Sequence, residues 1–123
     1  MQVRSIRWVG TATPAYAEMT AFCRDVLGLE IGFSEPMTTE FVTSDGDAFQ
    51  VMATGHPSAV FFGQHAHGPV PLFEVDDLDV ARRELEHAGI EIVGSPASDR
   101  EWEWLDLRAP DGQLYELAAR RRT

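Results

Sequence analysis

The sequence is poor in the features that would place it in several large classes of protein. Its one cysteine, Cys23, cannot form an internal disulfide, and it falls on an apolar helical stripe, so a buried, unreactive thiol is expected. No apolar run approaches the length of a membrane span, and no charged-plus-apolar leader precedes the first predicted strand. These absences favour a cytoplasmic protein of bacterial type.

Basic residues are also scarce. The chain has 10 of them against 20 acidic residues, which gives a formal net charge of −10. This balance argues against nucleic acid or an anionic membrane as a partner, and it would attract a cationic small molecule. The short basic end, residues 120–122, is expected to be a solvated tail. A glycine-rich phosphate loop followed by a helix is absent, so a nucleotide cofactor is not expected.

What the chain does contain is an internal repeat. Residues 45–51 and 111–117 each read as an Asp-Gly turn that leads into a strand with alternating faces, and Gln50 stands where Glu116 stands. Residues 28–31 and 89–92 form a second pair of similar segments, each at the end of a helical pattern, and the two pairs occur in the same order along the chain. These two repeated segments predict a tandem duplication.

Each copy is predicted to be one strand, one helix and three strands. The first has a strand at 2–9, a helix that starts at Thr13-Pro14 and ends at Gly28, and strands at about 29–34, 38–43 and 48–53. The second has a strand that includes 72–75, a helix between Asp77 as N-cap and Gly89, and strands at about 90–93, 102–108 and 113–119. The apolar residues 59–62 between the copies predict either a short extra strand or an apolar plug.

The two copies are expected to share one core. With 123 residues in all, each copy has near 60 residues, and a unit of that size alone would have a marginal core. We therefore expect a single domain over 1–123, with module one at about 1–54, a connector at 55–69 and module two at about 70–123.

With the repeat placed, the chain resembles the vicinal oxygen chelate superfamily, which includes glyoxalase I, bleomycin-resistance proteins and extradiol dioxygenases. The resemblance is carried by residues 21–29, 73–79, 88–91 and 109–117. It implies an α+β fold in which two tandem βαβββ modules form paired curved sheets around a cleft. It also implies that the protein is a homodimer.

The resemblance also names the positions at which metal-using members carry ligands, and here these are Trp8, Gln50, Val70 and Glu116. Trp8 and Val70 cannot donate a lone pair, and the neutral amide of Gln50 is a poor ligand for zinc, nickel or iron. Since a catalytic ion normally needs about three protein ligands, we expect no metal and no other cofactor. His65 and His67 leave two readings open: exposed loop histidines, or residues at a pocket rim that could bind a metal.

Strand alternation, anchored on Gln50 and Glu116, sorts the remaining residues by face and places Leu105 and Leu107 on the core side. The predicted ligand-binding residues are Trp8, Glu40, Gln50, Glu74, Trp102, Trp104, Asp106, Arg108 and Glu116. Aromatic walls and acidic groups suit a planar or cationic ligand. In the alternative reading, Arg108 pairs structurally with Asp106 or Glu116 and the tryptophans close a dimer interface.

Three functions are consistent with this pattern. The first is metal-independent binding of a small molecule, such as sequestration of an antibiotic. The second is an enzyme of glyoxalase, isomerase or dioxygenase type that uses Glu116 as a ligand or general base, since a carboxylate beside apolar walls has a raised pKa. The third is a dimeric interaction module with a vestigial cleft.

Overall fold

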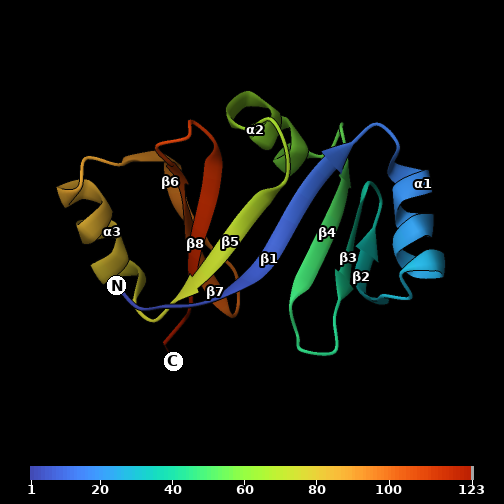
Figure 1. Ribbon diagram of the computed structural model, residues 1–123, viewed down its shortest axis with the longest axis horizontal. Helices are drawn as coiled ribbons and strands as arrows, with labels where there is room; N and C mark the ends of the chain where they lie inside the picture. The colour runs from blue at the N-terminus through green and yellow to red at the C-terminus, as the bar shows by residue number, and fades with distance from the viewer. Residues whose placement is uncertain (123) are drawn as a thin grey trace. The chain divides into compact units, whose positions relative to one another are not determined.

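The computed structural model describes residues 1–122 as strands and helices in the order that the repeat predicts. The elements are β1 (Val3–Thr13), α1 (Tyr16–Ala21), η1 (Phe22–Val26), β2 (Glu30–Glu35), β3 (Thr38–Val42), β4 (Ala48–Ala53), α2 (Pro57–His65), β5 (Val70–Val75), α3 (Leu78–His87), β6 (Glu91–Ser98), β7 (Trp102–Arg108) and β8 (Leu114–Arg120). The predicted α+β fold with two βαβββ modules is confirmed (Figure 1).

The chain divides into two compact units. The N-terminal unit is Arg7–Val70, and the C-terminal unit consists of Met1–Ile6 together with the chain from Pro71 onward. The first residues thus belong with the second module, and the backbone nitrogen of Asp76 donates to the carbonyl of Gln2 at 3.3 Å.

In the N-terminal unit, the strands lie in the order β2-β3-β4-β1, with β1 parallel to β4 and the other neighbours antiparallel. One face is covered by α1 and η1 (Figure 1). There Cys23 packs against Phe41 and Val51, because alternate residues of β3 and β4 point to that side. Cys23 is fully buried, and this burial raises the pKa of its thiol, as expected for an unreactive cysteine.

The C-terminal unit repeats this plan with the order β5-β8-β7-β6, in which β5 is parallel to β8. Its helix, α3, covers one face (Figure 1). Asp77 caps it, because its Oδ1 accepts from the backbone nitrogen of Val80 at 3.0 Å. Leu105 and Leu107 of β7 pack beneath this helix with Leu117 of β8, as the alternation predicts.

The two Asp-Gly turns are conformational copies of each other. In both, the glycine has a positive φ, 91° at Gly46 and 82° at Gly112, which side chains rarely allow. Gly46 donates to the carbonyl of Thr43 at 3.0 Å, and Gly112 donates to the carbonyl of Ala109 at 2.9 Å. The matching hydrogen bonds place Gln50 and Glu116 at the same point of their modules, third from the start of β4 and β8.

Three local predictions were wrong. Residues 59–62 lie in α2, not in a strand or a plug; Pro57 opens this helix and the Nδ1 of His56 accepts from the backbone nitrogen of Ser58. Helix α1 begins at Tyr16 without a side-chain cap, and the hydroxyl of Thr13 accepts from Ala15 instead. The basic end is not a tail from residue 120, because β8 runs through Arg120.

None of the helices within residues 1–122 is long and apolar enough to cross a membrane.

Candidate functional site

Three acidic side chains share the face of the C-terminal sheet opposite α3. Asp106 of β7 lies directly across from Glu116 of β8. Glu74 of β5 is aligned with Ala118, two residues beyond Glu116, so it projects from the same face. All three are buried, with 9%, 5% and 7% of Asp106, Glu116 and Glu74 exposed. Buried acids are rare unless they are paired, so this face is the first candidate for chemistry.

Glu116 holds a proton at neutral pH. Burial, the hydrogen bond with Asp106 and the charge of Asp106, in that order, raise the pKa of Glu116 to about 10. Because the hydrogen bond favours the protonated form, the Glu116 hydroxyl donates and Asp106 accepts. Because that proton is used within the pair, the pair offers a ligand one negative charge and the remaining carboxyl oxygens as acceptors. Glu116 is poorly suited to act as a general base near pH 7, because little of it is ionised there.

Two tryptophans lie on the same face of β7 as Asp106. Trp104 is aligned with Ala118 and is half-buried. Trp102 is aligned with Arg120, whose guanidinium carbon lies 4.6 Å from the centre of the Trp102 ring. The cation–π contact was not predicted, although the alternation along β8 from Glu116 to Arg120 was a signal for it. Trp102 thus already contacts a cation of this chain.

Arg108, the predicted base of the site, is anchored at the sheet margin. Its Nε lies 3.1 Å from Oε2 of Glu91, directly across on β6, and its Nη1 donates to the carbonyl of Gly112 at 3.1 Å. Sequence reasoning missed Glu91 as a partner, because that contact depends on the register between β6 and β7. These contacts give Arg108 a structural role in holding the final hairpin.

The N-terminal unit carries a hydrogen-bonded chain at the equivalent place. The indole Nε1 of Trp8 donates to Oε1 of Gln50 at 3.1 Å, and Nε2 of Gln50 donates to the hydroxyl of Thr38 at 2.8 Å. Thr38 is buried. Both ends of the Gln50 amide are therefore oriented by neighbours, which fixes which end accepts and which donates.

The Trp8 ring lies close to Gly10, two residues further along β1. A Cβ added to Gly10 would come within 2.1 Å of the ring, so only glycine leaves room for it. The Phe62 ring of α2 is tilted against the Trp8 ring, with the two ring centroids 6.1 Å apart. Glu40 is aligned with Gln50 on β3, and partial burial raises the pKa of its carboxyl. Trp8, Glu40 and Gln50 are thus placed on one face of their own sheet.

The residues at the family's ligand positions do not fit a metal ion. Val70 is fully buried and has no donor atom, and Trp8 uses its only polar group as a donor to Gln50. The amide oxygen of Gln50 is occupied by that indole, and Glu116 carries a proton. Within residues 1–122, no group of three or more His, Cys, Asp or Glu side chains is arranged to hold a metal.

The histidines of the connector lie at and beyond the end of α2. His65 is the last residue of this helix, and its ring lies 4.9 Å from that of Phe61. His67 follows the helix and is exposed. Ala66 between them has an extended backbone, with φ −142° and ψ 153°, but His65 belongs to the helix, so the two histidines do not lie on one strand.

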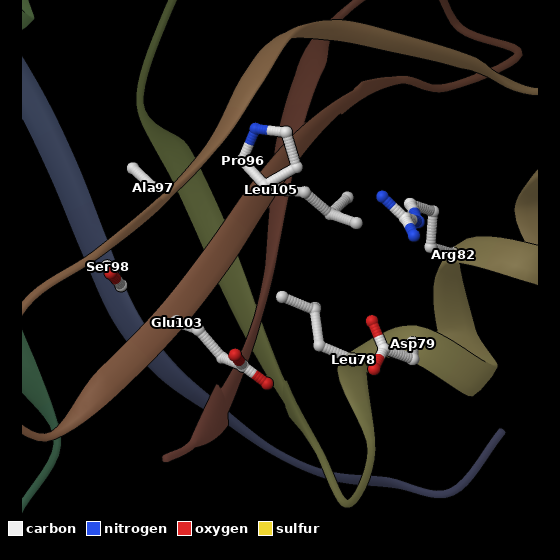
Figure 2. Close-up of a pocket in the computed structure, with 8 residues that line it drawn as sticks. All are labelled: Leu78, Asp79, Arg82, Pro96, Ala97, Ser98, Glu103 and Leu105. Carbon is white, nitrogen blue, oxygen red and sulfur yellow. The ribbon is translucent and has the colours of Figure 1, made fainter.

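A small pocket of about 180 Å³ lies on the other face of the C-terminal sheet, between α3 and the strands β6 and β7. Figure 2 shows Arg82 and Asp79 of α3 on one side, with Pro96 and Ala97 of β6 and Leu105 of β7 opposite. Since Leu105 belongs to the helix-covered face, this pocket is separate from the three acids on the opposite face.

Comparison with known proteins places the fold in a large group. The model of the Glyoxalase/Bleomycin resistance protein/Dioxygenase superfamily matches residues 5–117. A hypothetical protein from Bacillus halodurans C-125 is similar in structure, with a TM-score of 0.73, 16% identity and coverage of 97% of this chain and 96% of that one. No curated protein sequence matches significantly.

Two further structures are similar. A superfamily member from Vibrio splendidus 12B01 has a TM-score of 0.69 at 16% identity and covers 98% of this chain and 100% of its own. A variant of Streptomyces coelicolor methylmalonyl-CoA epimerase, in complex with 2-nitronate-propionyl-CoA, has a TM-score of 0.70 at 19% identity and covers 96% of this chain and 95% of its own. At these identities the likeness shows the fold alone.

Proposed function

Because the chain belongs to the Glyoxalase/Bleomycin resistance protein/Dioxygenase superfamily, we propose that it binds a small organic molecule without a metal ion, and that this molecule is planar or cationic, such as an antibiotic. The observation that carries the proposal is the Asp106–Glu116 pair, which presents one negative charge and acceptor oxygens on one face with Trp104. A ligand that carries an N–H cation on an aromatic system would match both features.

The N-terminal unit supports the same reading with neutral groups. Trp8 and Gln50 form a fixed aromatic and amide pair, and Glu40 adds an acid beside them. These groups can orient a planar ligand by contact and hydrogen bonding, and none of them supplies the strong polarisation that a metal gives a substrate oxygen.

The test is calorimetric titration of chelator-dialysed protein with a planar cationic dye that carries a ring N–H, such as proflavine at neutral pH. We expect Asp106→Asn, which keeps the shape and removes the charge, to weaken binding about tenfold or more. Trp104→Ala is expected to weaken it by about 0.5–2 kcal/mol. Glu103→Gln is the matched control, because Glu103 is the neighbouring acid on β7 and points to the helix-covered side. Equal losses in Asp106→Asn and Glu103→Gln would count against the proposal.

The second candidate is an enzyme that moves a proton, in the manner of an isomerase. It is favoured by the single proton held between two carboxyl groups, and methylmalonyl-CoA epimerase is among the similar structures. In this reading the Asp106 carboxylate accepts the proton that leaves the substrate carbon, and Glu116, which retains its proton at neutral pH, supplies a proton in return. Deuterium uptake by methylmalonyl-CoA in D₂O, present with wild-type protein and lost in Glu116→Gln, would establish it in place of simple binding.

The remaining proposals concern the protein's surroundings. Its net charge of −10 supports a small-molecule ligand over nucleic acid or membrane as a partner, and it is compatible with a cytoplasmic location. Family membership supports a homodimer. Cell fractionation and a solution mass would check these two points separately.

A further inference from the structure

The pocket between α3 and the strands β6 and β7 is a second candidate binding site, which the proposed function does not use. Its volume is about 180 Å³. Since an apolar cavity of about 150 Å³ holds one molecule of benzene, a pocket of this size has room for a ligand with a compact apolar group. We call it the α3 pocket.

The course of β6 forms one wall of the α3 pocket. Between two aligned pairs of residues, β6 has the three residues 94–96 where β7 has only Leu105. Gly94 has a φ of 70°, which side chains rarely allow, and Pro96 has no backbone N–H to donate to β7. The strand therefore bulges beside Leu105, and Pro96 lines the pocket there. The backbone as well as the side chains shapes this pocket.

The α3 pocket combines an apolar interior with charges of both signs. Leu78 and Leu105, which line it, are only 7% and 1% exposed, so they form its inner surface. Figure 2 shows the Arg82 guanidinium and the Asp79 carboxylate on the helix side, with the Glu103 carboxylate across from them. A ligand in the pocket would thus meet two acids and one base around an apolar contact.

Arg82 has the capacity to bind an anionic group. Its Nε lies 4.0 Å from Oε1 of Glu86, one turn further along α3, and this distance is too long for a hydrogen bond. The ion pair with Glu86 therefore uses none of the guanidinium N–H groups as hydrogen-bond donors. Two of these groups can donate in parallel to one carboxylate, which is the strongest arrangement for an arginine.

We propose that the α3 pocket binds a small zwitterion with a compact apolar group, the chemistry of a free aliphatic amino acid. Arg82 binds the carboxylate, and Asp79 and Glu103 attract the ammonium group. The apolar group contacts Leu78 and Leu105. A simple anion would be repelled by the two acids, and a simple cation would be repelled by the arginine, so the charges select a ligand that carries both.

The test is an NMR titration of isotope-labelled wild-type protein with leucine. Leucine is expected to shift the amide signals of Ala97 and Ser98, with a Kd of about 1 mM. Three comparison compounds each lack one feature: 3-methylbutylamine has no carboxylate, 4-methylpentanoate has no ammonium group, and glycine has no apolar group. Each of them is expected to bind at least about tenfold more weakly than leucine.

A pair of neighbouring arginines separates recognition from a general effect of charge. Arg82→Gln should weaken leucine binding about tenfold, and it should bind leucine and 3-methylbutylamine about equally, because the preference for a carboxylate is lost. Arg83→Gln is the matched control, because Arg83 is also exposed on α3 and does not line the pocket. This variant should keep both the affinity for leucine and the preference for the carboxylate.

Circular dichroism shows whether both variants are folded. Asp106→Asn should bind leucine as wild type does, and the three fused rings of proflavine are too large for the pocket, so this proposal and the dye-binding proposal fail separately. The absence of saturable shifts at about tenfold above the expected Kd would overturn the inference. Shifts confined to residues outside the pocket, equal binding of leucine and glycine, or equal losses in Arg82→Gln and Arg83→Gln would overturn it as well.

Discussion

Asp106 and Glu116 lie directly opposite each other on β7 and β8, and one proton is shared between them while 9% and 5% of the two residues are exposed. Two buried carboxyl groups that lie directly opposite each other cannot both be ionised without a compensating charge. In this chain, the proton on Glu116 supplies it.

The first prediction concerns stability against pH. The pKa of Glu116 is raised in the folded state from 4.5 to about 10, so the folded protein binds its proton more tightly than the unfolded chain does. The stabilisation is full below about pH 4.5 and is lost as the pH rises toward 10. One proton gives a slope of at most about 1.4 kcal/mol per pH unit. Urea unfolding at several pH values across this window measures it.

Glu116→Gln should abolish the slope, because the amide keeps a donor for Asp106 and does not titrate. This variant is expected to match wild type at the acidic end of the window and to exceed its stability at the alkaline end. Glu103→Gln, on the helix-covered side of β7, should leave the slope unchanged. A wild-type stability that rises with pH across the window would contradict the shared proton.

The second prediction concerns the Trp8 ring. Gly10→Ala should destabilise the protein by about 3 kcal/mol, because the new Cβ would lie within 2.1 Å of the ring and the indole would have to leave Gln50. In a Trp8→Ala background the same change should cost little, which gives a coupling energy of about 2 kcal/mol. Gly63→Ala in α2, where a Cβ meets nothing within 4 Å, should stabilise by about 0.5–1 kcal/mol. Denaturant midpoints measure all four variants.

The fold was predictable because its signals are local. The Asp-Gly turns at Gly46 and Gly112 require a conformation that glycine allows, and the alternation of β7 sorts Leu105 from Asp106 without knowledge of any neighbour. The prediction for residues 59–62 was wrong because a short, continuous apolar run shows no periodicity that distinguishes a strand from a helix. The start signal of this helix is His56 before Pro57, and histidine is not among the usual N-cap residues.

The site was predictable only as a list of residues. Alternation places Glu116 and Asp106 on one face, but their direct opposition depends on the register between two strands. A raised pKa was expected for Glu116 from apolar surroundings, and the hydrogen bond that Glu116 donates to Asp106 raises this pKa further. The Arg120 contact with Trp102 and the Glu91 contact with Arg108 likewise depend on register, which a single sequence does not specify.

The third prediction separates a structural arginine from a binding one. Glu91→Ala and Arg108→Ala should each lower stability slightly, and the double variant should show a coupling energy of about 0.5–1 kcal/mol. Dye binding by Glu91→Ala should stay near the wild-type value, because Glu91 lies at the outer strand β6. Thermal unfolding and the calorimetric titration measure both quantities. A coupling energy of zero would mean that the 3.1 Å contact does not contribute in solution.

The fourth prediction is that the protein, purified without chelators, contains no stoichiometric transition metal. Two of the four family ligand positions, Trp8 and Val70, have no lone pair to give, and the oxygen of Gln50 accepts from Trp8. Glu116 would have to release a proton before it could bind an ion, which adds a cost that grows as the pH falls below about 10. Elemental analysis of wild type beside Glu116→Ala measures the content.

The comparison with the variant makes the result decisive. Adventitious metal should appear at similar, substoichiometric levels in wild type and in Glu116→Ala, because adventitious binding does not depend on the Glu116 carboxyl. Near-stoichiometric zinc, nickel, manganese or iron that is lost in Glu116→Ala would instead show that the carboxyl gives up its proton to an ion. In that case the shared proton is present only when the site holds no metal. Metal-dependent catalysis would then replace metal-independent binding as the proposed function of this face.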